Sequence, residues 1–473
     1  MFFSEEQITQ LAPDAGSLKA GKDLVSVSKW QNCFFNARVL WGEVQGSGKE
    51  PYLTLIDTQT LAFKCSCPSR KFPCKHGIGL MFLFSSYKGF FLEKNDEPLW
   101  VKEWMDKRTE KVTKPGEVAV NDDESEKNQA KKTQQKDKRY SERTESVLSG
   151  VKETQMILKD LVRAGLLVLP EKGSDFFLKT AARMVDAKAT GLGNRWKFLA
   201  GINYADDNWK ENVLAQMADM YLLTVSYQLS AVSYQKENEE PKLGNSNINH
   251  QISRLNADIK SLIGFTTDKK DLVEDVSTEK TKDDWLILSS EKTREEDIMI
   301  QKNWLFGFTS QRFALIIEFK HKTQAFEIYL AKGSCIKAEL VFFPSVVPQR
   351  AVINNFSTND DLKLELEINS GLCLDNWQAS QKEFVEHISQ LPWLTEVPQC
   401  IRLVKLAKDE KNNWFVTDAE KTSLPIHPSF EKDKIFQLLA ITNGNNIEKL
   451  FLLRTAHYIL PLGFILGEKY WAL

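Results

Sequence analysis

Three cysteines and one histidine lie close together near the start of the chain: Cys65, Cys67, Cys74 and His76. Their spacing is Cys-x-Cys, six residues, then Cys-x-His. Thiolate sulfur and imidazole nitrogen are ligands that Zn²⁺ prefers, and four of them complete its tetrahedron. A short loop brings two such pairs together at little cost in loop entropy. Because four protein ligands leave no position for a catalytic water, the spacing predicts one structural zinc ion.

Two other uses of these cysteines must be compared with zinc binding: a disulfide pair beside a bystander, and a redox site. A secreted disulfide framework would carry cysteines more densely and evenly than this chain, which has seven in 473 residues. A redox motif would not require His76. The remaining cysteines are isolated in the sequence and are expected to be small, buried apolar residues: Cys33, Cys335, Cys373 and Cys400.

The segments on either side of the ligands have patterns that could position them. Between residues 30 and 56, aromatic and β-branched residues predict strands joined by turns. The run Gly77–Phe84, directly after Cys-x-His, is apolar on nearly every side, which predicts a helix buried against a sheet. Gly77 and Gly79 would let another backbone approach this helix closely. We therefore expect a compact module that ends near Trp100 and Trp104.

The four ligand positions match the signature of the SWIM-type zinc finger, which is Cys-x-Cys, a variable gap, then Cys-x-His. The resemblance continues at residues 11–17, 41–48, 51–52 and 184–192, which are similar to bacterial SWIM zinc-finger family proteins. It implies a small zinc-finger module, made of a β-hairpin plus a helix, over residues 1–105. DNA binding and protein interaction are the roles that this resemblance implies.

Beyond this module the residue pattern changes three times. Residues 106–145 mix charges of both signs with few large apolar residues, which predicts a charged, partly disordered linker, or alternatively a transient helix. Residues 146–270 place apolar side chains three and four apart and predict a helical domain, interrupted at Gly191 and Gly193. Residues 280–473 alternate as in Leu362–Ile368, which predicts a β-rich domain of antiparallel strands. The expected fold class is α+β.

Composition and missing motifs exclude several functions. A net charge of −2 gives no overall attraction to nucleic acid. No leader pattern and no apolar run of about 20 residues is present, so we expect a cytoplasmic protein without membrane contact. No nucleophile elbow or dinucleotide fingerprint occurs, and the other histidines share no ligand spacing, so we do not expect an enzyme. These histidines are His250, His321, His387, His427 and His457.

Two functions of different classes fit the predicted finger. Basic residues surround the ligands, and Phe63 and Phe72 could stack on bases, which would give salt-dependent DNA binding. The basic residues are Lys64, Arg70, Lys71 and Lys75. The same cations could instead balance the net −1 of three thiolates around Zn²⁺. Most of the chain has no nucleic-acid signature, so we predict a protein-interaction adaptor with an unknown partner, and DNA binding is the alternative.

Overall fold

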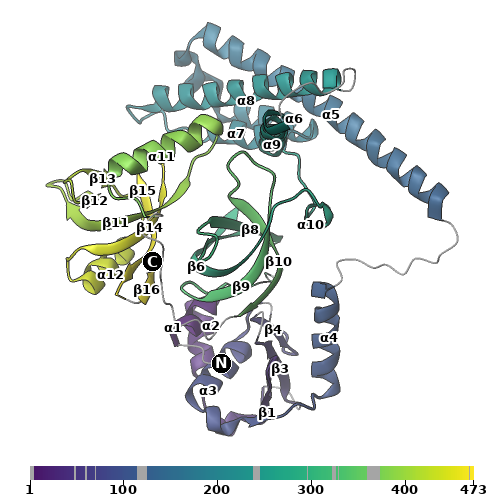
Figure 1. Cartoon of the computed structure of the whole chain (residues 1–473), viewed down its shortest axis with the longest axis vertical. Coiled ribbons are helices and arrows are strands. Elements are labelled where there is room, and N and C mark those ends of the chain that lie inside the picture. The colour runs from purple at the N-terminus through teal and green to yellow at the C-terminus, as the bar shows by residue number, and fades with distance from the viewer. Residues whose placement is uncertain are drawn as a thin grey trace. The chain divides into compact units, whose positions relative to one another are not determined.

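The computed structural model describes residues 5–46, 50–58, 61–69, 71–113, 125–237, 246–295, 297–321, 326, 328, 330–358, 373–467 and 469–473. The chain forms two compact units (Figure 1). One comprises Met1–Gly116, Val276–Phe343 and Pro348–Leu473, and the other comprises Glu117–Asp275 and Pro344–Val347. The boundary between Gly116 and Glu117 falls inside the segment predicted as a linker.

The N-terminal module contains a sheet in the order β4-β3-β2-β1-β5, in which only β5 pairs in parallel, with β1. It is larger than the predicted hairpin plus helix. The strands are β1 (Trp30–Phe35), β2 (Val39–Val44), β3 (Tyr52–Asp57), β4 (Ala62–Cys65) and β5 (Leu92–Glu93). The helices are α1 (Glu5–Leu11), α2 (Ala15–Lys22), α3 (Lys75–Ser86) and α4 (Leu99–Thr113), with 3₁₀ turns at Val27–Lys29 and Lys88–Phe90.

Helix α3 is the centre of this module. Its apolar side chains are fully buried on several faces, including Ile78, Leu80 and Leu83, so the prediction of a helix buried against a sheet is confirmed. The module core joins α1 and α3 to side chains of the sheet. Gly21 of α2 and Gly79 of α3 let these two helices approach each other closely. A Cβ atom at Gly79 would lie 2.9 Å from Leu24 Cβ and 3.2 Å from the carbonyl oxygen of Gly21.

Alanine at position 79 is expected to destabilise the module by about 1 kcal/mol. The overpacking cost of roughly 1–3 kcal/mol exceeds the roughly 1 kcal/mol that alanine gains in helix propensity. Urea unfolding followed by tryptophan fluorescence measures the difference. Gly89→Ala is the matched control, because no atom lies within 4 Å of the Cβ that it would add. Equal unfolding midpoints for the two variants would contradict the close approach of α2 and α3.

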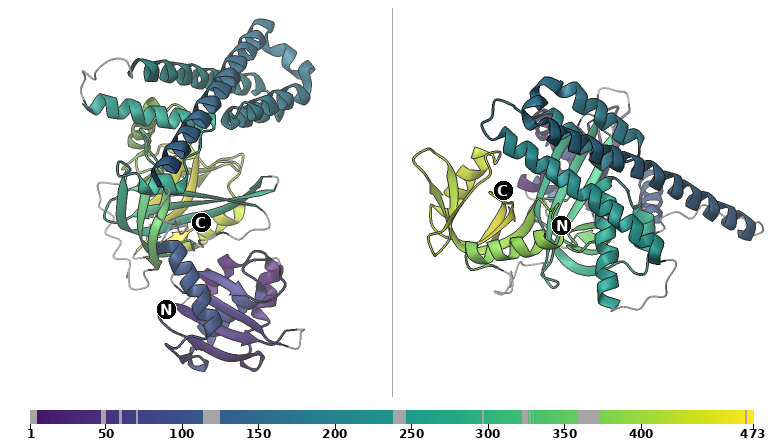
Figure 2. Two further views of the ribbon diagram at one scale, coloured as in Figure 1. Left: turned by 90° about the vertical axis from the view of Figure 1, so that its right-hand side faces the viewer. Right: turned by 90° about the horizontal axis from the view of Figure 1, so that it is seen from above.

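The helical unit is organised along α5 (Ser125–Ala164), the long helix that runs diagonally through the view from above (Figure 2, right). Part of the segment predicted as a linker is helical, which was the alternative prediction. Residues 106–113 belong to α4 and residues 125–145 belong to α5. Residues 114–124 lie outside the described residues. The other helices are α6 (Leu169–Asp186), α7 (Thr190–Ala200), α8 (Trp209–Glu237), α9 (Ser246–Ile263) and α10 (Lys269–Glu274), with a 3₁₀ turn at Leu166–Val168.

Five strands close into a barrel in the order β10-β8-β7-β6-β9 (Figure 1). Strands β8 and β10 pair in parallel, and the other neighbours pair antiparallel. In chain order this is 1-2-3-5-4-1, the Greek-key arrangement of an OB-type barrel. The strands are β6 (Lys280–Glu295), β7 (Ile298–Gly307), β8 (Phe313–His321), β9 (Cys335–Phe342) and β10 (Arg350–Thr358). The predicted strand Leu362–Ile368 lies outside the described residues.

A six-stranded antiparallel sheet, in the order β13-β12-β11-β14-β15-β16, completes the C-terminal part. It packs against the barrel, because the ring of Phe451 in β14 lies 5.5 Å from the ring of Phe306 in β7. The α+β class, with its helical bundle and β-rich C-terminal part, is confirmed. The strands are β11 (Val397–Lys408), β12 (Trp414–Thr417), β13 (Ser423–Pro425), β14 (Ile447–Arg454), β15 (Ile459–Leu466) and β16 (Lys469–Ala472), and the helices are α11 (Trp377–Gln390) and α12 (Lys432–Thr442).

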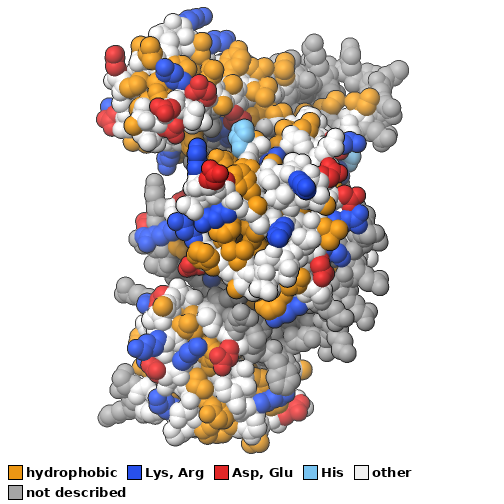
Figure 3. Space-filling view, turned by 90° about the vertical axis from the view of Figure 1, so that its left-hand side faces the viewer, with side chains coloured by type: hydrophobic (Ala, Val, Ile, Leu, Met, Phe, Trp, Pro, Cys, Tyr) orange, Lys and Arg blue, Asp and Glu red, His pale blue; other side chains and the backbone are white. Residues whose placement is uncertain are grey.

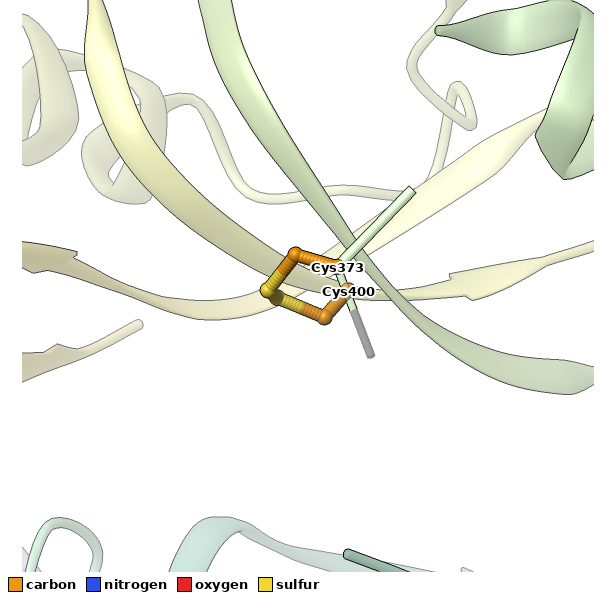
Figure 4. The surroundings of a disulfide bond; sticks show 2 residues. All are labelled: Cys373 and Cys400. Carbon is orange, nitrogen blue, oxygen red and sulfur yellow. A yellow bond between two sulfur atoms is a disulfide. The ribbon is translucent and has the colours of Figure 1, made fainter. Parts of the chain in front are cut away.

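Two cysteines predicted to be isolated form a disulfide, Cys373–Cys400 (Figure 4). The prediction was wrong for this pair because 27 positions separate the two residues in sequence, while the backbone of Leu374 pairs with β11 beside Cys400. Cys33 and Cys335 are buried and free, as expected, and burial raises the pKa of each thiol to about 12.

Candidate metal centre

The end of one strand and the start of one helix supply the predicted ligands. Cys65 is the last residue of β4, where it pairs across to Thr54 of β3, and Cys67 follows in the loop. Cys74 is the N-cap residue of α3, and His76 lies in the first turn of that helix. The structure thus brings all four predicted ligands together, with the Cys-x-His pair at the helix start as expected.

The distances between the ligand atoms fit a tetrahedral zinc site. One ligand atom from each residue lies within 4.8 Å of all the others. His76 Nδ1 lies 3.6 Å from Cys65 Sγ and 3.9 Å from Cys74 Sγ. Around a zinc ion the sulfur–nitrogen edge would be about 3.6 Å and the sulfur–sulfur edge about 3.8 Å. A small inward movement of the farther atoms would complete the tetrahedron.

Hydrogen bonds and burial shift the pKa values of the thiols in the cluster. The Cys74 thiol donates to Cys65, and this hydrogen bond, with help from His76 and Thr54, lowers the pKa of Cys65 to about 4. The same hydrogen bond and burial raise the pKa of Cys74, which keeps the proton. Burial also raises the pKa of Cys67. A bound cation would replace these protons, because thiolates are the metal-binding form of cysteine.

An ion pair ties the loop between the two ligand pairs to α2. Lys71 Nζ lies 2.9 Å from Asp14 Oδ2, and the Asp14 side chain also accepts a hydrogen bond from the Ser17 backbone as the N-cap of α2. Hydrogen bonding from Lys71 lowers the pKa of Asp14 to about 2. The loop therefore contacts a residue 57 positions earlier in the sequence.

The basic residues predicted for nucleic-acid contact do not form one uniform patch. Lys64 on β4 and Lys75 at the first turn of α3 are exposed. Lys71 is exposed too, but its charge is paired with Asp14. Arg70 lies outside the described residues. Of the three described lysines, Lys71 therefore forms an ion pair within the module.

A hollow of about 580 Å³ lies directly beside the ligand cluster. Its floor and walls come from α2, the β2–β3 hairpin and the loop between the ligand pairs, and Cys67 and His76 form part of its lining. The other lining residues are Gly16, Ser17, Ala20, Leu24, Gln45, Gly46, Tyr52, Pro68, Ser69, Lys71 and Lys75. The sequence did not predict this hollow, because residues 16–24, 45–52 and 67–76 line it together and none of these segments carries a ligand-binding motif for it.

Residues 142–240 match the model of the SWIM-associated four-helix bundle domain. This match is consistent with a SWIM-type zinc-finger family protein. The match covers α6, α7, α8 and the second part of α5, so the resemblance inferred from the ligand spacing is confirmed by a different part of the chain. The chain has no significant match among curated proteins or solved structures. None of the helices in the described ranges has the length and hydrophobicity needed to cross a membrane.

Proposed function

We propose that this SWIM-type protein binds one structural zinc ion through Cys65, Cys67, Cys74 and His76, and acts as a non-catalytic protein-interaction adaptor. The distances at the cluster support zinc, and four protein ligands would leave the ion no open position. The zinc ion would link β4 to α3 and would fix the loop that lines the hollow. The cytoplasmic location stays a prediction. The free cysteines of the ligand cluster fit a reducing compartment, whereas a disulfide such as Cys373–Cys400 is typical of an oxidising one.

The hollow beside the cluster is the observation that carries the adaptor role. Its volume of about 580 Å³ lies in the range typical of ligand sites, roughly 300–1,000 Å³. Ala20, Leu24 and Pro68 give it an apolar lining, and Lys75 places a positive charge at its edge. An apolar side chain followed by a carboxylate would suit such a surface, and a protein segment provides both.

DNA binding is the second candidate, and the exposed Lys64 and Lys75 favour it. The OB-type barrel adds little support. In OB-folds the face formed by the second and third strands binds oligonucleotides. Here Trp304 and Phe306 of β7 are at most 3% exposed, since they pack into the core shared with the C-terminal sheet. Much of that face is therefore covered by the protein itself.

Site-specific photo-crosslinking separates the two candidates. A photoreactive amino acid at Ser69, which lines the hollow and is exposed, is expected to capture a defined protein in cells. The matched control carries it at Leu92, which is 65% exposed and does not line the hollow. Capture at Ser69 alone, reduced by Lys75→Glu, is the expected result.

A filter-binding assay on the full chain provides the DNA arm of the test. The adaptor proposal predicts negligible DNA binding at low salt, both for the wild type and for Lys64→Glu/Lys75→Glu. Salt-sensitive binding that the double variant loses, without protein capture at Ser69, would replace the adaptor with a DNA-binding protein. Zinc content should be the same in both proteins, because neither lysine is a ligand.

A further inference from the structure

Helix α8 carries large apolar residues on two of its faces, but the described structure covers only one of them. The covered face is 2% exposed or less at Val213, Met217, Met220, Leu223 and Tyr227. The other face of α8 exposes Leu214 by 50%, Leu222 by 45% and Leu229 by 64%. Hydrophobic side chains also reach the surface of the helical unit at the top of Figure 3.

The outer residues of α8 form one continuous stripe. We define the α8 stripe as Leu214, Ala218, Tyr221, Leu222, Val225 and Leu229. Steps of four, three and four residues separate the first, second, third and fifth of these, which is the spacing that packs one helix against another. No charged residue belongs to the stripe, although it extends about 22 Å along the helix axis. Its length and spacing suit a second helix as the occupant.

Helix α5 gives this stripe one positively charged edge. Gln155 Nε2 donates to Gln228 Oε1 at 3.0 Å, and Lys159 Nζ lies 5.7 Å from the centre of the Tyr221 ring. Residue numbers therefore rise along α5 as they fall along α8, so the two helices run antiparallel. On this edge Lys152 and Lys159 are exposed, whereas Arg163 is paired with Asp160 at 3.2 Å. The edge carries an excess of two positive charges.

We propose that the α8 stripe binds an amphipathic helix of a partner protein, with acidic side chains along the edge that faces α5. Apolar side chains of the partner would cover Leu222 and Leu229, and its carboxylates would lie opposite Lys152 and Lys159. An antiparallel second copy of this chain would instead place the same lysines opposite each other. The proposal uses no residue of the metal centre, so it is independent of the adaptor role proposed for the finger.

Designed peptides test this surface on the full chain. The probe is a labelled helical peptide of about three heptads, with leucine at positions a and d and glutamate at e and g. A second peptide has lysine in place of every glutamate. Fluorescence anisotropy is expected to show that the glutamate peptide binds about tenfold more tightly than the lysine peptide. Lys152→Glu/Lys159→Glu should reverse this preference.

Three variants and one size measurement decide the outcome. Leu222→Glu/Leu229→Glu should weaken binding of the glutamate peptide by about tenfold or more. Leu178→Glu on α6 is the control for an exposed leucine outside the stripe, and it should bind like the wild type. Circular dichroism should show the same helix content in all variants. Absence of binding to the wild type, or binding unchanged in the Leu222/Leu229 variant, would overturn the proposal. A wild-type dimer in light scattering that this variant converts to a monomer would also overturn it, in favour of a second copy.

Discussion

Replacing Cys67 with serine is expected to unfold the N-terminal module as well as remove its metal. Structural zinc contributes roughly 10–16 kcal/mol to the folding of small finger peptides, which is as large as the whole stability of a typical domain, roughly 5–15 kcal/mol. In this module the ligands lie at the end of β4 and the start of α3, and α3 provides much of the core. Metal analysis and near-ultraviolet circular dichroism of the purified variant measure both losses.

Cys33→Ala is the matched control for this variant. Cys33 is also a free cysteine of the module, 5% exposed, but its side chain faces the core and is not part of the ligand cluster. It should lose some packing energy and retain its full zinc content. Full zinc retention by the Cys67→Ser protein would rule out the proposed ligand set.

Alanine at position 191 is expected to destabilise the helical unit by about 3 kcal/mol, near the upper end of overpacking costs. A Cβ atom on Gly191 would lie 1.9 Å from the carbonyl oxygen of Leu262 and 2.9 Å from the carbonyl carbon of Ile263. Both are backbone atoms at the end of α9, so rotation of a side chain cannot relieve the clash. Differential scanning calorimetry measures the effect as a lower unfolding temperature.

Gly201 offers a control at the other end of the same helix. A Cβ atom there would be 3.6 Å from the Phe198 carbonyl oxygen, an ordinary contact, so Gly201→Ala should change the unfolding temperature little. If Gly191→Ala unfolds at the same temperature as Gly201→Ala, the close packing of α7 against α9 is wrong.

The sequence predicted best those features that are local in the chain. The four ligands lie within twelve residues, and the apolar run after them predicts a buried helix, so the site and α3 were predictable together. Gly191 and Gly193 were interpreted as a break between helices. They lie instead at the start of α7. Gly191 lets the backbone of α7 approach the end of α9, which is about 70 residues away in sequence.

Features that depend on distant pairs could not be predicted. The Asp14–Lys71 ion pair changes the role of one predicted DNA contact, and no local pattern indicates it. The Cys373–Cys400 disulfide joins two cysteines that look isolated in sequence. Alternation predicted the strands of the barrel, but not the parallel pairing of β8 with β10 that closes it. The alternation of residues along a strand indicates which of its faces is buried, but it does not indicate which other strand pairs with it.

X-ray absorption at the zinc edge tests the central claim, a closed zinc site formed by one strand end and one helix start. The full-length protein loaded with one equivalent of zinc is expected to show three sulfur atoms at about 2.3 Å and one nitrogen at about 2.0 Å. This shell would leave the ion structural and the module rigid. A shell with fewer than three sulfurs, completed by oxygen from water, would contradict the account, because the ion would then have an open position for catalysis.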